Sequence, residues 1–101
     1  MPFTVVFTPE AEDQIAAIYR YIARAASPIT AERYASALID YCEGLRNFPR
    51  RATLHDVIRP GLRLTNYKGR AVIAFAVEDR VVSIIGVYYG GQDYGSVLQS
   101  E

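Results

Sequence analysis

The sequence has one cysteine, one histidine and no tryptophan among its 101 residues. A single cysteine, Cys42, excludes an intramolecular disulfide and any metal site built from several thiolates. Cys42 falls in a helical pattern, so we expect its thiol to be buried. The only histidine, His55, would have to serve in any Ser/His/Asp or Cys/His system, yet no nucleophile motif flanks it. We therefore expect His55 to lie at the surface or to order a loop, and we expect neither a metal nor a cofactor.

Long apolar runs and export signals are also missing. No segment approaches the apolar length that crosses a bilayer. Residues 1–4 show no basic region followed by an apolar core and a cleavage site. The length fits one compact unit. We therefore expect a single domain over residues 1–101, soluble and cytoplasmic, with no membrane partner.

The chain carries no net charge. This argues against affinity gained by wrapping phosphate backbone, and against direct sequence-specific DNA binding. The charge is unevenly placed, because residues 1–45 have three more acidic than basic side chains and residues 46–80 have five more basic than acidic ones. The basic centre is either ordinary solvated charge or a binding surface.

The familiar catalytic motifs are not found either. Gly90 and Gly91 follow a strand-like run, but no P-loop helix start comes after them. Glu10, Glu12 and Asp13 lie where the first turn of a helix favours negative charge, which explains them without a functional role.

The chain opens with the pattern of a strand followed by a capped helix. Apolar side chains alternate over residues 3–7, which predicts a short strand. Thr8 can cap a helix that has Pro9 at its first position. We predict this helix from Pro9 to about Ala26. Its apolar stripe, at three- and four-residue steps, is Ala11, Ile15, Ile18 and Ile22.

A second helix is predicted after a proline-containing break at residues 27–30. Thr30 can cap it, and we expect it to run from Ala31 to about Asn47. Its apolar stripe consists of Tyr34, Leu38, Tyr41, Cys42 and Leu45. Two helices of similar length joined by a tight turn form an antiparallel hairpin.

The second half of the chain reads as a sheet. Apolar side chains in residues 50–60 follow neither a helical nor a strand period, so this segment forms an irregular connection or contains a short strand. Strands are predicted at residues 62–67, 70–78 and 81–89, with turns at 67–69 and 78–80. The order is β-α-α-β-β-β, an α+β fold with the helical hairpin packed on a mainly antiparallel twisted sheet.

The last two predicted strands are apolar on both faces. In residues 70–78, Ala71, Ile73, Phe75 and Val77 share one face, and Val72, Ala74 and Ala76 share the other. In residues 81–89 we assign Val82, Ile84, Gly86 and Tyr88 to one face, and Val81, Ser83, Ile85, Val87 and Tyr89 to the other. The helical hairpin can cover only one face of the sheet. The second face would be covered by residues 94–101, by a second copy of the chain, or by another partner.

Arginine and tyrosine gather on the last strands and their exit. This composition suits a protein-binding hot spot, and equally an RNA site in which rings stack on bases. As a binding surface for a partner protein we select Arg63, Tyr67, Arg70, Val72, Ala74, Tyr88, Tyr89, Gln92, Asp93 and Tyr94. An acid–base ribonuclease would instead use four groups, provided that they converge. These are Arg63, Lys68, Arg70 and Tyr94.

The order and spacing of five segments resemble the ParE branch of the RelE/ParE toxin superfamily. The segments lie at residues 8–15, 18–23, 45–49, 59–63 and 87–93, and together with the opening strand they span nearly the whole chain. They read TPEAEDQI, IYRYIA, LRNFP, RPGLR and VYYGGQD.

The resemblance implies a toxin of a type II toxin–antitoxin system. Such a toxin is neutralised by a small cognate antitoxin that wraps its groove and sheet. We expect the chain to form a homodimer or a toxin–antitoxin hetero-oligomer. ParE-like members poison DNA gyrase, whereas RelE-like members cleave mRNA in the ribosomal A site.

The chain departs from the family at the exit motif, which often reads His-Gly-x-Arg-Asp. Here the corresponding residues are Tyr89, Gly90, Gly91, Gln92 and Asp93, so two groups useful to a ribonuclease are missing. The zero net charge points the same way. Our first hypothesis is a gyrase inhibitor that acts by binding and has no active site of its own. The alternatives are a ribosome-dependent endoribonuclease and a degenerate toxin that only binds antitoxin.

Overall fold

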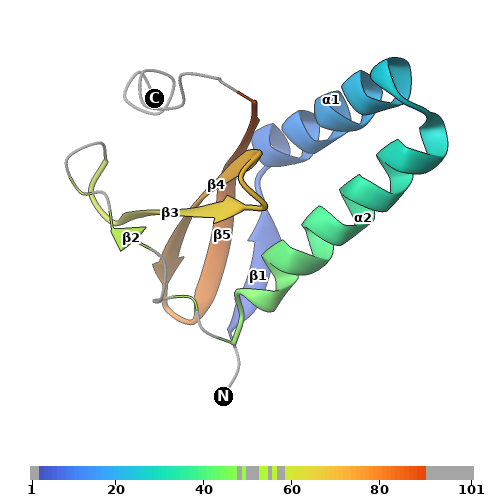
Figure 1. Ribbon diagram of the computed structural model, residues 1–101. Coiled ribbons are helices and arrows are strands. Elements are labelled where there is room, and N and C mark those ends of the chain that lie inside the picture. The colour runs from blue at the N-terminus through green and yellow to red at the C-terminus, as the bar shows by residue number, and fades with distance from the viewer. Residues whose placement is uncertain (1–2, 48, 50–52, 55, 57–58, 91–101) are drawn as a thin grey trace.

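The computed structural model describes residues 3–47, 49, 53–54, 56 and 59–90. The elements in chain order are β1 (Thr4–Phe7), α1 (Pro9–Ala25), α2 (Pro28–Gly44), β2 (Thr53–Leu54), β3 (Leu62–Tyr67), β4 (Ala71–Glu78) and β5 (Val81–Tyr89). Figure 1 shows α1 and α2 as an antiparallel hairpin on one side of a twisted sheet. The predicted α+β fold is confirmed, and β2 is a short strand within residues 50–60, which was one of the two predicted alternatives for that segment.

The sheet has five strands in the order β1-β5-β4-β3-β2. β1 runs parallel to β5, and the other neighbouring strands are antiparallel. Two tight turns make the hairpins possible. Asp79 and Arg80 have φ of 50° and 64°, and Lys68 and Gly69 have φ of 53° and 71°. Positive φ at both central residues gives a turn whose twist matches that of the strands.

The first helix follows the sequence prediction. The side chain of Thr8 accepts a hydrogen bond from the Ala11 backbone N–H at 3.1 Å, and Pro9 occupies the first helical position. The four residues of the predicted stripe are all buried. The predicted cap, start and apolar face are confirmed.

The second helix begins and ends three residues earlier than predicted. Ser27, not Thr30, is its N-cap, because the Ser27 hydroxyl accepts from the Thr30 N–H at 3.1 Å and Pro28 takes the first helical position. The helix ends at Gly44, and the next N–H groups bond three residues back instead of four, from Leu45 to Cys42 at 3.1 Å. Glycine is a weak helix former, which allows this early end. In the described part of the chain, neither helix is long and apolar enough to cross a membrane.

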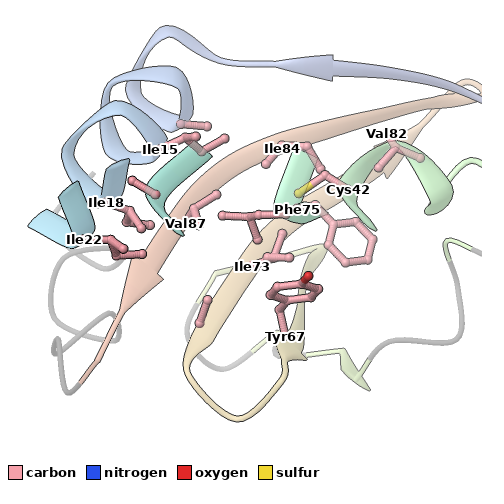
Figure 2. Packing of buried hydrophobic residues seen from close by; sticks show 14 residues of the cluster. Ile15, Ile18, Ile22, Cys42, Tyr67, Ile73, Phe75, Val82, Ile84 and Val87 are labelled. Carbon is pink, nitrogen blue, oxygen red and sulfur yellow. The ribbon is translucent and has the colours of Figure 1, made fainter. Parts of the chain in front are cut away.

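The main core lies between the helices and the face of the sheet that they cover, which we call the helix face. Ile15, Ile18 and Ile22 of α1 and Cys42 of α2 pack with Phe75 and other buried residues of the sheet. Figure 2 shows these side chains facing one another across the two layers. Cys42 has no exposed surface, and burial raises the pKa of its thiol to about 12. The predicted buried thiol is confirmed.

A β-bulge changes which residues of β5 face the helices. Ala74 pairs with Gly86, whereas the next residue, Phe75, pairs with Ile84, so Ile85 is an extra residue in β5. Beyond the bulge the alternation is reversed. Val87 and Tyr89 pack on the helix face with Val82 and Ile84, while Tyr88 belongs to the opposite face. The predicted face assignment of residues 86–89 is therefore wrong, because strict alternation takes no account of an inserted residue.

The opposite side of the sheet, the far face, has a small core of its own. Its buried residues are Leu62, Leu64, Ala74 and Tyr88, which are 1%, 7%, 0% and 3% exposed. Val72 and Ile85 pack against them and are partly buried. These four side chains are therefore shielded from solvent in the single chain, without a partner protein.

Candidate functional site

Five tyrosines make a continuous series of ring contacts between the helices and the sheet. Tyr21 of α1 contacts Tyr89 of β5 with ring centroids 5.9 Å apart, and Tyr89 contacts Tyr34 of α2 at 5.6 Å. Tyr34 contacts Tyr67 of β3 at 5.8 Å, and Tyr67 contacts Tyr41 of α2 at 5.0 Å. We call these five residues the tyrosine row. Helix and sheet residues alternate along it, so the row joins the two layers.

The strand register explains how the centre of the row is built. Tyr67 and Tyr89 both pair with Ala71 of β4, one on each side. Residues paired across a sheet point to the same face, and alanine leaves space between the two rings. Tyr34 of α2 contacts both rings. Tyr41 lies two helical turns further along α2, on the same face of that helix.

The Tyr34 hydroxyl is buried and has no hydrogen-bond partner among the described residues. Burial raises the pKa of Tyr34 to about 12, and the neighbouring Tyr89 and Tyr67 act in the same direction. The Arg70 guanidinium acts in the opposite direction. Tyr34 therefore keeps its proton at neutral pH, and Arg70 is close enough to interact with it electrostatically.

The other end of the row is anchored to β3. The Tyr41 hydroxyl and the Thr65 hydroxyl share a hydrogen bond of 3.1 Å. The Lys68 ammonium lies 5.5 Å from the centroid of the Tyr67 ring, within cation–π range. The β3–β4 turn therefore brings positive charge to the row.

A groove of about 340 Å³ opens where the row meets the end of β5. The described residues that line it are Ala17, Ile18, Tyr21, Arg70, Tyr89 and Gly90. The only charged side chain among them is that of Arg70, which is exposed. The groove thus combines two tyrosine rings, a small apolar floor and a guanidinium group.

The structure brings part of the sequence-predicted site together at this groove. Tyr67 and Tyr89 lie in the row, and Lys68 and Arg70 lie in the adjoining turn. Arg63 pairs with Phe75 towards the other end of β3. Five residues separate it from Lys68, or about 16 Å along an extended strand. Arg63 therefore does not converge with Lys68 and Arg70.

Three other predicted site residues are not at the groove. Val72, Ala74 and Tyr88 are on the far face, where Ala74 has no exposed surface. Gln92, Asp93 and Tyr94 lie outside the described residues, as does His55. The roles assigned to these residues stay predictions.

Sequence reasoning missed Tyr21 as a site residue, and placed Tyr34 and Tyr41 only in the core. A signal for α2 was present, because a spacing of seven residues puts two tyrosines on one helix face. Tyr21 has a weaker signal, three residues after Ile18 and beside Ile22, at the border of the apolar stripe. Its contact with Tyr89 depends on how α1 packs on β5.

The described residues of the site suit recognition of another molecule. They offer aromatic surface, hydroxyl groups and positive charge. Tyrosine and arginine dominate the energetics of protein–protein contacts because both combine a large contact area with directional hydrogen bonds. No group of three or more His, Cys, Asp or Glu among the described residues is placed to hold a metal ion.

Comparison with known proteins agrees with this fold. In structure, the chain is similar to a chain of the chromosomal ParDE toxin–antitoxin system from P. aeruginosa, with a TM-score of 0.77 and 16% identity over 87% of this chain and 96% of that one. It is also similar to a chain of the RelBE2 toxin–antitoxin complex from Mycobacterium tuberculosis, with a TM-score of 0.64 and 18% identity over 88% and 99%. The comparison with curated proteins gives no match. The family model described as the ParE toxin of the type II toxin–antitoxin system parDE matches residues 5–94. The chain therefore belongs to the ParE toxin family.

Proposed function

We propose that this toxin blocks DNA gyrase by binding to it and is neutralised by a cognate antitoxin. Membership of the ParE family supports the toxin role over residues 5–94. Structural relatives from the ParDE system and the RelBE2 complex support an antitoxin partner. Gyrase is the target associated with the ParE branch. This function would place the chain in the cytoplasm.

The observation that carries a binding mechanism is the tyrosine row with Arg70 beside it. The row presents aromatic contact surface at its two ends, because Tyr21 and Tyr41 are 58% and 37% exposed, while Tyr67 is 6% exposed and supports the row from within. The guanidinium of Arg70 adds a charged contact at the rim. These are the components of a protein-binding hot spot.

An endoribonuclease is the second candidate, and one observation favours it. Lys68 and Arg70 lie in one turn beside the row, where two cations and aromatic rings would suit an RNA strand. The distant position of Arg63 and the zero net charge weigh against it.

Induction of the toxin in a bacterial host separates these candidates through two measurements on the same culture. We expect growth arrest and a shift of a reporter plasmid towards relaxed topoisomers, with no new mRNA 5′ ends inside translated codons. New 5′ ends at codons with unchanged plasmid topology would replace the gyrase proposal with the endoribonuclease. Normal growth at a verified level of folded toxin would indicate a chain that only binds antitoxin.

A further inference from the structure

A second groove continues the site along α1. It has a volume of about 330 Å³ and is lined by Tyr21, Arg24 and Ala25 among the described residues. Tyr21 also lines the groove that contains Arg70 and Tyr89. The two hollows therefore share one tyrosine, with an arginine on each side of it. We call this surface the double-arginine groove.

Among the described residues that line the double-arginine groove, the charged side chains are all positive. Arg24 and Arg70 are exposed, and none of the described lining residues is acidic. Arg24 lies in the last turn of α1. Along α1, Glu10 and Glu12 lie three turns or more from Arg24, whereas Asp13 precedes the lining residue Ala17 by about one turn. The described lining residues thus form a local positive site in a protein of zero net charge.

The lining between the arginines is apolar and aromatic. Tyr21 is 58% exposed, although its ring also contacts Tyr89. Ala17 and Ala25 contribute small side chains on either side, so there is space for an apolar guest side chain against the ring. A guanidinium binds a carboxylate through two parallel hydrogen bonds. A guest with two carboxylates around one apolar side chain would match the two arginines and the tyrosine ring between them.

We infer that the double-arginine groove binds an acidic segment of the cognate antitoxin, with one carboxylate on Arg24, one on Arg70 and an apolar side chain against Tyr21. This inference rests on the proposed function for the existence of the antitoxin, and it adds the chemistry of the contact. A nucleic acid is the less favoured guest. A continuous phosphate backbone gains its affinity from many basic contacts, which a protein of zero net charge does not favour, whereas a short acidic segment needs only the two arginines.

The test measures the affinity of the purified full-length toxin for the purified antitoxin encoded by the adjoining reading frame, at low and at high salt. Arg24→Gln and Arg70→Gln remove one charge each and keep a long polar side chain. Arg33→Gln is the matched control, because Arg33 is an exposed arginine on α2 that lines a different groove. Circular dichroism melting of each variant verifies the fold.

We expect Arg24→Gln and Arg70→Gln each to weaken antitoxin binding at least tenfold at low salt and to flatten its salt dependence. Arg33→Gln should stay within about twofold of wild type, as expected for an isolated surface charge. Affinities of all three variants within twofold of wild type would overturn the inference. So would weaker binding with an unchanged salt dependence, because the lost contact would then not be a charge pair.

A fluorescein-labelled single-stranded RNA of mixed sequence serves as the competing probe. The inference would be contradicted if wild-type toxin bound this RNA, if Arg70→Gln abolished that binding, and if the same variant left antitoxin affinity unchanged. The groove would then be assigned to nucleic acid. Failure of the gyrase proposal is read separately, from plasmid topology. The affinity result for the groove stands whichever target the toxin has.

Discussion

The side-chain carbonyl of Gln14 accepts a hydrogen bond of 2.7 Å from the backbone N–H of Val87. This bond is needed because β5 extends beyond its neighbour. β1 pairs with β5 only as far as Ile84, so the following residues have no strand on that side. Thr8 donates its hydroxyl to the Ile84 carbonyl at 3.0 Å, and its backbone N–H donates to the same carbonyl at 3.1 Å. The beginning of α1 thus takes over the role of a missing strand.

Replacing Gln14 should therefore test whether this bond stabilises the fold. Gln14→Leu leaves the partly buried Val87 N–H without an acceptor, which should lower the free energy of unfolding by about 1–3 kcal/mol. Gln14→Glu keeps an acceptor of the same reach and should lower it by less than about 0.5 kcal/mol. Urea denaturation of both variants measures the difference. Equal loss in both would mean that the bond contributes nothing.

The fold requires a residue without a side chain at position 86. A Cβ atom there would lie 2.7 Å from Cε2 and Cζ of Tyr88, whose ring is buried over Gly86. Gly86→Ala should therefore destabilise the chain by about 1–3 kcal/mol through overpacking. Gly44→Ala is the matched control, because nothing lies within 4 Å of its Cβ position.

The control should leave stability unchanged or raise it by up to about 1 kcal/mol, since alanine is the better helix former. In the double variant Gly86→Ala/Tyr88→Ala the methyl group has space, so the two costs should not add. Thermal or urea unfolding gives all four values. Strict additivity would show that the methyl group and the ring do not compete.

Two tyrosines of the row should respond in opposite ways to loss of the hydroxyl. Tyr34→Phe removes a buried hydroxyl without a partner among the described residues, so stability should be unchanged or higher by up to about 1 kcal/mol. Tyr41→Phe removes the 3.1 Å bond to Thr65 and should cost about 0.5–1 kcal/mol. Adding Thr65→Val to Tyr41→Phe should cost little more if the pair acts as one bond. A larger loss for Tyr34→Phe than for Tyr41→Phe would reverse this assignment.

The raised pKa of Tyr34 predicts a stability change at high pH. The folded chain holds this proton up to about pH 12, whereas the unfolded chain releases it near the usual 10.0. The unfolded state therefore binds fewer protons between these values, so stability falls as pH rises. Relative to Tyr34→Phe, the wild type should be unaffected below about pH 10 and should lose stability between pH 10 and 12. A constant difference over this range would show that the Tyr34 pKa is not raised.

The first helix was predictable because its signals are local. Thr8 and Pro9 set the start, and the three isoleucines repeat with helical spacing. Ser27 and Pro28 repeat the same cap at α2, yet the proline favoured interpretation as a break. Pro28 follows the end of α1 at Ala25 by three residues. In the sequence alone, a proline that follows one helix and a proline at the first position of the next helix look the same.

The bulge and the tyrosine row could not be read from the chain in this way. An inserted residue such as Ile85 has no distinctive side chain, so the reversal of Val87 and Tyr88 becomes visible only from the strand register. The row depends on contacts between distant segments, such as Tyr21 with Tyr89. Local spacing can place each tyrosine on a face, but only the packing of α1 and α2 on the sheet brings the rings together.

The most direct measurement is a supercoiling assay with purified DNA gyrase, relaxed plasmid and increasing amounts of the purified toxin. A gyrase-binding toxin of the ParE family should reduce supercoiling in proportion to its concentration, and purified antitoxin added first should restore it. Full supercoiling at a large molar excess of the same toxin preparation that binds antitoxin tightly would contradict gyrase as the target.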